Sequence, residues 1–258
     1  MNEEILRAEN LQKSFGGLRA IDSLNFAISQ GQIKSVIGPN GAGKTTLFNL
    51  ITGIFPPSNG ILEFKGRSLN GLKPHFIAQL GISRTFQNLQ LFANMTVLEN
   101  AMVGRHTQTS AGLLSTGFRL SWMKKEEKEI EEQALAELSF MGLEEKAALE
   151  ATSMPLGEQK LLEIARALAT YPKLLLLDEP AAGLNIRETE KLCHTIRKIQ
   201  QRGITIILVE HDMSLVMEIS DEVLVLNYGK KVAEGTPRDI QRNPEVIAAY
   251  LGEEIGDA

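Results

Sequence analysis

The stretch from Gly38 to Thr46, GPNGAGKTT, constrains the fold of this chain more than any other feature. It has the form G-x-x-x-x-G-K-[ST] and lies between an apolar run, Ile33 to Ile37, and a helix-like segment, Leu47 to Thr52. In such a strand–loop–helix context the glycines let backbone N–H groups surround a phosphate chain, and the helix N-terminus adds positive partial charge. A Gly-rich turn before a helix is the alternative, which the flanking segments disfavour. We therefore predict a site for a nucleoside triphosphate.

The loop residues have distinct expected roles in that site. Lys44 would reach the β- and γ-phosphates, and Thr45 would place its hydroxyl on Mg²⁺. The residues expected to bind the nucleotide here are Gly38, Pro39, Asn40, Gly41, Ala42, Gly43, Lys44, Thr45 and Thr46.

Length and charge narrow the class of protein. The chain has 258 residues, enough for one large or two small domains, and a formal charge of −5, which argues against a general nucleic-acid binder. Its one cysteine, Cys193, allows no intrachain disulfide and fits a reducing compartment. The N-terminus does not resemble a secretory signal, and no run approaches the roughly 20 apolar residues that span a bilayer. We expect a cytoplasmic chain that works at a membrane only through a partner.

Hydrophobic spacing and turn residues predict three regions of different character. The front mixes short strands within residues 4–37 with a strand at Ile61 to Phe64. The middle contains a helix at Pro74 to Leu80, a strand at Gly81 to Gln87, an exposed loop at Arg105 to Ser121 and a helix at Trp122 to Met141. The last third alternates helices at 157–170, 187–202 and 213–219 with strands at 174–177, 204–209 and 223–226, and ends in two short helices. Such β-α alternation predicts a parallel sheet.

Acidic residues follow the apolar strand Leu174 to Leu177. Asp178 would bind Mg²⁺, directly or through water, and Glu179 is placed to act as the general base towards water. A solvated strand end is the alternative, which the phosphate loop disfavours. A neighbouring strand leads to Glu210-His211, and we expect His211 to emerge at the same sheet edge, where ligands bind in open parallel sheets.

These segments together resemble the nucleotide-binding subunits of ABC transporters, in order and over nearly the whole chain. GPNGAGKTT is similar to the Walker A loop, LLLLDEP to the Walker B strand, Glu210-His211-Asp212 to the switch region, and Ala182-Gly183-Leu184-Asn185 to the D-loop. SRTFQN is similar to the Q-loop and MPLGEQ to the signature motif. The resemblance implies catalytic roles for Glu179, His211 and Gln87, Mg²⁺ coordination by Thr45, Gln87 and Asp178, adenine stacking by Phe15, and contact with a nucleotide across a dimer by Pro155, Gly157 and Glu158.

The resemblance also implies an architecture. It is an α/β fold of the P-loop NTPase class, with a RecA-like parallel-sheet core, an antiparallel β subdomain and an α-helical subdomain. The whole chain, 1–258, would be one ATP-binding domain. Residues 1–87 and 172–235 would form the core with the β subdomain, residues 88–171 the helical subdomain with the signature, and residues 236–258 a helical tail.

Longer phrases resemble one subfamily, the LivG-type ATPases of branched-chain amino acid importers. They are GISRTFQNLQLFANMTVLENAMVGRH, EPAAGLN, VEHDMSLVMEISDEVLVLNYGK and EGTPRDIQRNPEVIAAYLGEE. The resemblance implies a chain that hydrolyses ATP on the inner face of the cell membrane to power import of hydrophobic amino acids. Its partners would be integral-membrane permease subunits and, indirectly, a periplasmic amino-acid-binding protein.

Three positions depart from the family pattern. Pro155 replaces the signature serine, Leu156 replaces its first glycine, and Asn185 replaces the D-loop acid. Gly157 remains, so a backbone N–H and the helix dipole can still meet a phosphate. This weaker signature favours a heterodimer with a sister ATPase and leaves a homodimer open.

Three other functions fit less well. An ABC-type ATPase acting on DNA or ribosomes would carry coiled-coil arms or two cassettes, and the acidic balance also disfavours nucleic acid. An ATPase serving a lipid or another solute stays open, because the substrate would not touch this chain. A non-enzymatic nucleotide-binding regulator is disfavoured by Glu179 together with His211.

Overall fold

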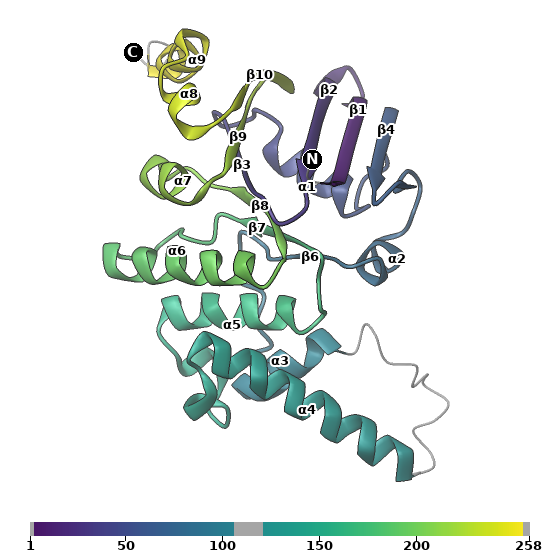
Figure 1. The fold of residues 1–258 in the computed structure, drawn as a ribbon, viewed down its shortest axis with the longest axis vertical. Helices are drawn as coiled ribbons and strands as arrows, with labels where there is room; N and C mark the ends of the chain where they lie inside the picture. Colours follow the sequence, from purple (N-terminus) through teal and green to yellow (C-terminus); the bar gives the residue numbers. More distant parts are fainter. Residues whose placement is uncertain (1–2, 106–120, 255–258) are drawn as a thin grey trace.

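The computed structural model describes residues 3–105 and 121–254, which form two β-sheets and several layers of helices (Figure 1). The α/β class predicted from the sequence is confirmed. All but the two ends of the loop expected at Arg105 to Ser121 lie outside the described residues.

The larger sheet has six strands in the order β10-β9-β3-β8-β7-β6. Strands β9, β3, β8, β7 and β6 are parallel to one another, and β10 forms an antiparallel hairpin with β9. Strand β10 was not predicted, because the polar sequence KKVAEG gives no strand signal. The strands are β3 (Ile33–Ile37), β6 (Ile82–Arg84), β7 (Leu174–Asp178), β8 (Thr205–Val209), β9 (Glu222–Asn227) and β10 (Lys230–Gly235).

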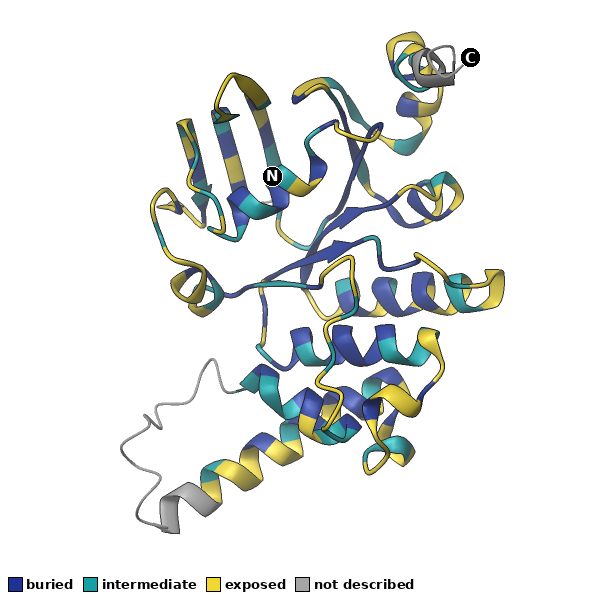
Figure 2. Ribbon diagram, turned by 180° about the vertical axis from the view of Figure 1, so that it is seen from behind, coloured by how far each residue is buried: buried dark blue, intermediate teal, exposed yellow. Residues whose placement is uncertain are grey.

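Strand β7 is buried on both faces, as its continuous apolar run predicts. Leu175 and Leu177 pack into one hydrophobic core with helices of one side, whereas Leu174 and Leu176 pack into a second core on the other. Figure 2 shows the central strands of this sheet as buried, whereas the outer surfaces of the helices are exposed. One strand therefore separates two cores.

The smaller sheet is antiparallel, in the order β2-β1-β4-β5. The prediction of several short strands was wrong, because β1 and β2 each run for 12 residues. Bulges interrupt their pairing, and Asn10 and Ser23 have positive φ, so the apolar residues do not alternate regularly. Its strands are β1 (Glu4–Phe15), β2 (Leu18–Ser29), β4 (Asn59–Phe64) and β5 (Arg67–Ser68).

Helix α1 (Lys44–Ile51) joins the two sheets. Its side chains Leu47, Phe48 and Ile51 share a core with the inner residues of β1, β2 and β4 and with Val36 of β3. The phosphate loop is thus anchored at its far end between both sheets.

Helices on the opposite face of the large sheet from α1 form the core that contains Leu175 and Leu177. Helix α4 ends at Met141, and the following Gly142 has φ +71°, a conformation common just after a helix; the predicted bounds of this helix were correct to one residue. Helix α3 was not predicted, although Thr96 and Glu99 form a capping box at its start. The helices are α2 (Pro74–Gln79), α3 (Val97–Val103), α4 (Ser121–Met141), α5 (Leu156–Leu168), α6 (Ile186–Gln201), α7 (Met213–Ile219), α8 (Pro237–Gln241) and α9 (Pro244–Glu254), with 3-10 turns at Glu144–Lys146 and Ala151–Ser153.

Strand β6 is shorter than the predicted strand from Gly81 to Gln87. Thr85 still donates its N–H to the Leu176 carbonyl at 2.9 Å. The next N–H, that of Phe86, is taken by the carboxylate of Glu163 on α5 at 3.2 Å, so the chain turns away from the sheet towards that helix.

Lys34 of β3 is a fully buried charge. Its ammonium donates to the Ala27 carbonyl of β2 at 2.5 Å and lies 2.9 Å and 2.5 Å from the carboxylates of Glu222 and Glu234. It therefore ties β2 to the β9–β10 hairpin.

We expect Lys34→Met to lower the free energy of unfolding by about 3 kcal/mol, because it leaves two partly buried carboxylates without their cation. Urea unfolding measures the loss. The control is Lys128→Met, whose side chain is 76% exposed in a surface pair and should change stability by less than about 0.5 kcal/mol. Equal stability of the two variants would contradict this role of Lys34.

Candidate functional site

The phosphate loop connects β3 to α1 through glycines in conformations that other residues rarely adopt. Gly38, Gly41 and Gly43 have φ of +148°, +78° and +104°. A Cβ on Gly38 would lie 2.0 Å from the Leu226 carbonyl oxygen, and one on Gly43 would lie 2.6 Å from that of Ala20. The loop can therefore keep this shape only with glycine at both positions.

Lys44 folds back across the loop from the start of α1. Its buried ammonium donates to the carbonyl oxygens of Gly38 and Pro39 at 2.5 Å and 2.9 Å. Thr45, in the first turn of α1, is exposed. The N-terminus of this eight-residue helix thus presents a cation, a hydroxyl and first-turn N–H groups, a set suited to bind phosphate.

Asp178, at the end of β7, is buried against a cation. Its Oδ2 accepts a hydrogen bond from the Arg84 guanidinium at 2.6 Å. Arg84 also donates to Asn49 of α1 at 2.6 Å and lies over the rings of Phe48 and Phe86. One guanidinium thus connects α1, β6 and β7, a contact that the sequence analysis missed.

The three residues expected to be catalytic, Glu179, Gln87 and His211, meet at the carboxylate of Glu179. Its Oε1 lies 2.8 Å from His211 Nε2, and its Oε2 accepts a hydrogen bond from Gln87 Nε2 at 3.0 Å. These residues follow β7, β8 and β6, three adjacent strands, at their carboxyl ends.

The backbone of Glu179 is held in a left-handed conformation, with φ +49°. Its N–H donates to the Val209 carbonyl at 2.9 Å. Its carbonyl oxygen accepts from the Ala182 N–H at 3.1 Å and from the Lys160 ammonium at 3.2 Å. A side chain-bearing residue in this conformation costs about 1 kcal/mol, which these hydrogen bonds offset.

Glu210 orients the residue that follows it. Its buried carboxylate accepts from the N–H groups of Ala181 at 2.7 Å and His211 at 3.0 Å. Burial raises the pKa of Glu210, and these backbone hydrogen bonds oppose the rise. Glu210 thereby links the turn after β7 to His211.

The donor set at this edge suits a divalent cation. Thr45, Asp178 and Gln87 offer hydroxyl, carboxylate and amide oxygens, the ligand types that Mg²⁺ prefers. Because Gln87 uses its NH₂ group on Glu179, its amide oxygen is left to accept other contacts.

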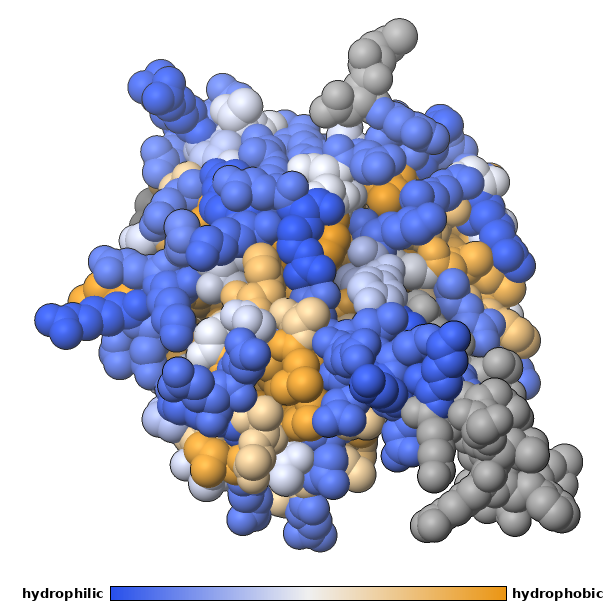
Figure 3. All heavy atoms as spheres, turned by 60° about the horizontal axis from the view of Figure 1, so that its bottom comes forward, coloured by the Kyte–Doolittle hydropathy of each residue, from blue (hydrophilic) through white to orange (hydrophobic). Residues whose placement is uncertain are grey.

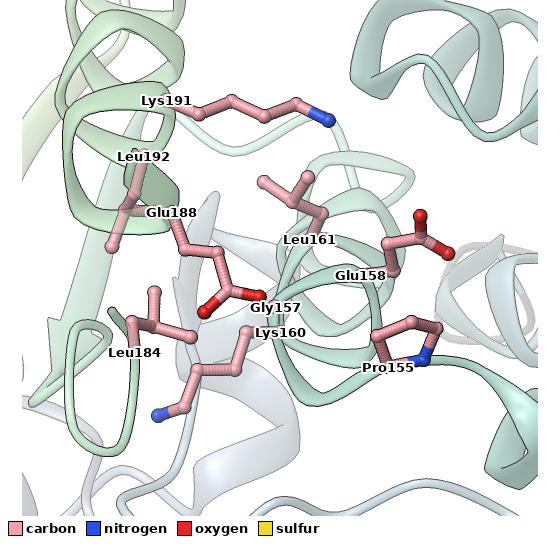
Figure 4. A pocket seen from close by; sticks show the side chains of 9 residues that line it. All are labelled: Pro155, Gly157, Glu158, Lys160, Leu161, Leu184, Glu188, Lys191 and Leu192. Atoms are coloured by element: carbon pink, nitrogen blue, oxygen red, sulfur yellow. The ribbon is translucent and has the colours of Figure 1, made fainter. Parts of the chain in front are cut away.

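The residues expected to contact a nucleotide across a dimer lie apart from the phosphate loop. Pro155 is the N-cap residue of α5, and Gly157 lies in the first turn of this helix. With Glu158 they line a pocket between α5 and α6, and no residue of the phosphate loop lines this pocket (Figure 4). The Glu158 carboxylate is bound by Lys146 at 2.6 Å and 2.5 Å. The Glu188 carboxylate points towards Gly157, where an added Cβ would lie 2.8 Å from its Oε1.

Asn185 and Phe15 occupy defined positions. Asn185 is the N-cap of α6, where it and Glu188 form a reciprocal capping box. Phe15 ends β1 with 41% of its surface exposed, packed edge-on against Phe55 at a centroid distance of 5.1 Å. The β2 strand of the same hairpin contacts the phosphate loop through Ala20.

Residues 21–182 match the family model of the ABC transporters. The chain belongs to the ABC transporter family. Nucleotide-binding subunits of this family hydrolyse ATP, so the predicted family and ATPase activity are confirmed. Residues 230–255, which cover β10 and the tail helices, match a further model described as a branched-chain amino acid ATP-binding cassette transporter.

Relatives of this ABC cassette are similar over their full length. The high-affinity branched-chain amino acid transport ATP-binding protein BraF of Pseudomonas aeruginosa and the protein LivG of Escherichia coli are each 44% identical, over 98% of this chain and 100% of their own. A probable LivG of Archaeoglobus fulgidus is 38% identical over 96% of both chains.

Solved cassettes share the fold. The ADP conformation of MJ1267, an ATP-binding cassette of an ABC transporter, has a TM-score of 0.85 and 34% identity, covering 97% of this chain and 99% of its own. The dimeric cassette MJ0796 has a TM-score of 0.76 and 25% identity, covering 91% and 99%. The predicted cassette fold is therefore confirmed.

Sequence reasoning missed the buried charged residues Arg84, Lys160 and Glu163 of this ABC cassette, and it named Glu210 without its role as an acceptor for backbone N–H groups. The sequence signal for Glu163 is a charged residue within the apolar segment LLEIARAL. Separately, every helix within residues 3–105 and 121–254 is too short or too polar to cross a bilayer.

We expect Gly38→Ala to weaken ATP binding by about tenfold or more, because the new methyl group displaces the loop from the Leu226 carbonyl. Calorimetric titration with ATP measures this. The control is Gly66→Ala, at φ +70° with nothing within 4 Å of the added Cβ. It should cost about 1 kcal/mol of stability and leave ATP affinity unchanged. Unchanged affinity in the Gly38 variant would show that the loop shape is not required.

Proposed function

We propose that this chain hydrolyses ATP to power import of branched-chain amino acids through a membrane permease. The observation that carries the proposal is the identity of 44% to BraF and LivG over 98% of the chain, together with the subfamily match at residues 230–255. The meeting of Glu179 with Gln87 and His211 supports the hydrolytic step.

The nucleotide would lie along the phosphate loop. First-turn N–H groups of α1 and the Lys44 ammonium would bind its phosphates, and Phe15 would stack on the adenine. Thr45, Asp178 and Gln87 would hold Mg²⁺, which neutralises phosphate charge when bound. Arg84 already offsets the charge of Asp178 on one of its two oxygens.

Hydrolysis would depend on Glu179. Its carboxylate would accept a proton from the attacking water, while Gln87 and His211 hold its two oxygens in place. Lys44 would stabilise the charge that spreads over the phosphate oxygens. The chemistry needs placement of water and charge more than covalent participation of the protein.

We assign separate tasks to the parts of the chain. Residues 1–87 and 172–235 would bind and cleave ATP, residues 88–171 would present the signature, and residues 236–258 would form an accessory tail. Near Gln87 in the sequence, Phe86 and Phe92 are exposed. Figure 3 shows hydrophobic surface at the centre of one face of the molecule, with hydrophilic surface around it. Such a patch suits an integral-membrane partner on the inner face of the membrane.

We propose that the working unit is a heterodimer of two cassettes. The Glu188 carboxylate beside Gly157 would repel a phosphate brought by a partner cassette, and Pro155 offers neither an N–H nor a hydroxyl. The first-turn N–H groups of the 13-residue helix α5 still favour an anion. The solved cassette MJ0796 is dimeric at 25% identity. A homodimer is the competing assembly.

We expect Glu179→Gln to lower ATP hydrolysis by about 10²-fold or more and to keep ATP binding, because the amide cannot take a proton from water. Phosphate release and calorimetry measure the two effects. In proteoliposomes with the permease subunits, this variant should also stop uptake of labelled leucine. Glu129→Gln, on the exposed face of α4, is the control. ATP-dependent transport of another solute, without leucine uptake, would disprove the proposed substrate class.

We expect purified Glu179→Gln protein to remain a monomer in light scattering when ATP is added alone, because its own signature is weak. Addition of a sister cassette with a serine-bearing signature should then produce dimers. A dimer formed by this chain alone with ATP would contradict the heterodimer and favour the homodimer.

A further inference from the structure

Helix α5 carries two buried charged side chains one turn apart, Lys160 and Glu163. Their exposed fractions are 7% and 5%, on a helix face that is otherwise apolar. In Figure 4 Lys160 points away from Glu158, towards the side of Leu184. A buried charge is costly unless it is bound by partners, so the contacts of both residues need a reason.

Lys160 binds the backbone of Glu179. Its ammonium donates to the carbonyl oxygen of Glu179 at 3.2 Å, at the residue with left-handed φ. Burial lowers the pKa of Lys160, and the charges of Glu163, Glu210 and Glu179 oppose this. The ammonium therefore contacts the backbone of Glu179 while the Glu179 carboxylate remains free for Gln87 and His211.

Glu163 binds the segment that carries Gln87. Its Oε1 accepts from the Phe86 N–H at 3.2 Å, and its carboxylate also accepts from the backbone of Gln90. Burial raises the pKa of Glu163. The backbone hydrogen bonds and the positive charges of Arg166 and Lys160 oppose this rise. Both ends of the segment 86–90 are thus hydrogen-bonded to Glu163 of α5.

These contacts form a closed ring. Lys160 holds Glu179, Glu179 accepts from Gln87, Gln87 follows the held N–H of Phe86, and Glu163 returns the ring to α5. Strands β6 and β7 are paired in the sheet, but Gln87 lies beyond the end of β6, so its hydrogen bond to Glu179 keeps its geometry better when both residues are also held by one rigid element. Helix α5 supplies that element.

We infer that Lys160 and Glu163 are positioning residues for ATP hydrolysis: Lys160 sets the conformation of Glu179, and Glu163 sets the place of Gln87 relative to it. The inference rests on the proposed role of Glu179 as base. It gives α5 a function within its own chain's ATP site, besides presenting Pro155 and Gly157 to a partner.

The decisive variant is Lys160→Met in the full-length chain. We expect kcat for ATP hydrolysis to fall about tenfold, because Glu179 loses a charged hydrogen-bond donor, while KM for ATP stays within about twofold. Lys160→Arg should restore most of kcat, since a guanidinium can donate to the same carbonyl. The control is Lys198→Met, an exposed lysine near the end of α6, which should leave kcat and KM unchanged. If Lys160→Met does not fold, Lys160→Gln takes its place.

Glu163 is tested through the segment that it binds. Glu163→Ala should raise hydrogen exchange of the amides of residues 86–90 and lower kcat. Glu163→Gln, whose amide oxygen can still accept from Phe86, should retain most of both properties. All variants are assayed below their melting temperatures, which are measured separately.

The outcomes separate this inference from the proposed function. Loss of stability with unchanged kcat in Lys160→Met, or a loss of kcat that Lys160→Arg does not reverse, overturns the inference. If Glu179→Gln keeps wild-type hydrolysis, the assigned base is wrong and the inference falls with it. If Glu179→Gln is inactive while Lys160→Met is normal, only the inference fails.

Discussion

The site depends on the way that the parallel strands end together. Strands β3, β8, β7 and β6 are neighbours in one sheet, and each continues at its carboxyl end into residues of the site. The strands β3, β7 and β8 are buried along their whole length, so the chain can expose polar groups only where they end. Burial of the strands therefore gathers the phosphate loop, Asp178, Glu179 and His211 at one edge.

Site residues that belong to a local sequence pattern could be predicted from the sequence. The phosphate loop requires glycines at fixed spacing, and the four leucines before Asp178 indicate a strand buried on both faces. The full length of β1 was not predictable, since bulges at several positions break the alternation of apolar residues. The start of helix α3 has a sequence signal, because Thr96 and Glu99 have the spacing of a capping box.

Contacts between distant residues could not be read from spacing. Arg84 and Asp178 are 94 residues apart in the sequence, and Phe86 and Glu163 are 77 residues apart, yet each pair forms a hydrogen bond. Their pairing is set by how α5 and β6 pack against β7, which no local pattern encodes. The sequence shows that Pro155 and Asn185 depart from the family pattern. Only the structure shows that Asn185 is the N-cap residue of α6.

At Glu179 the residue type that would give the most stable backbone differs from the one that ATP hydrolysis needs. Glycine adopts the left-handed conformation of this residue without strain, so Glu179→Gly would relieve the turn of about 1 kcal/mol. It would also remove the carboxylate that meets Gln87 and His211. The residue that suits the fold best at this position is thus one that cannot do the chemistry, and selection for stability alone would discard the base.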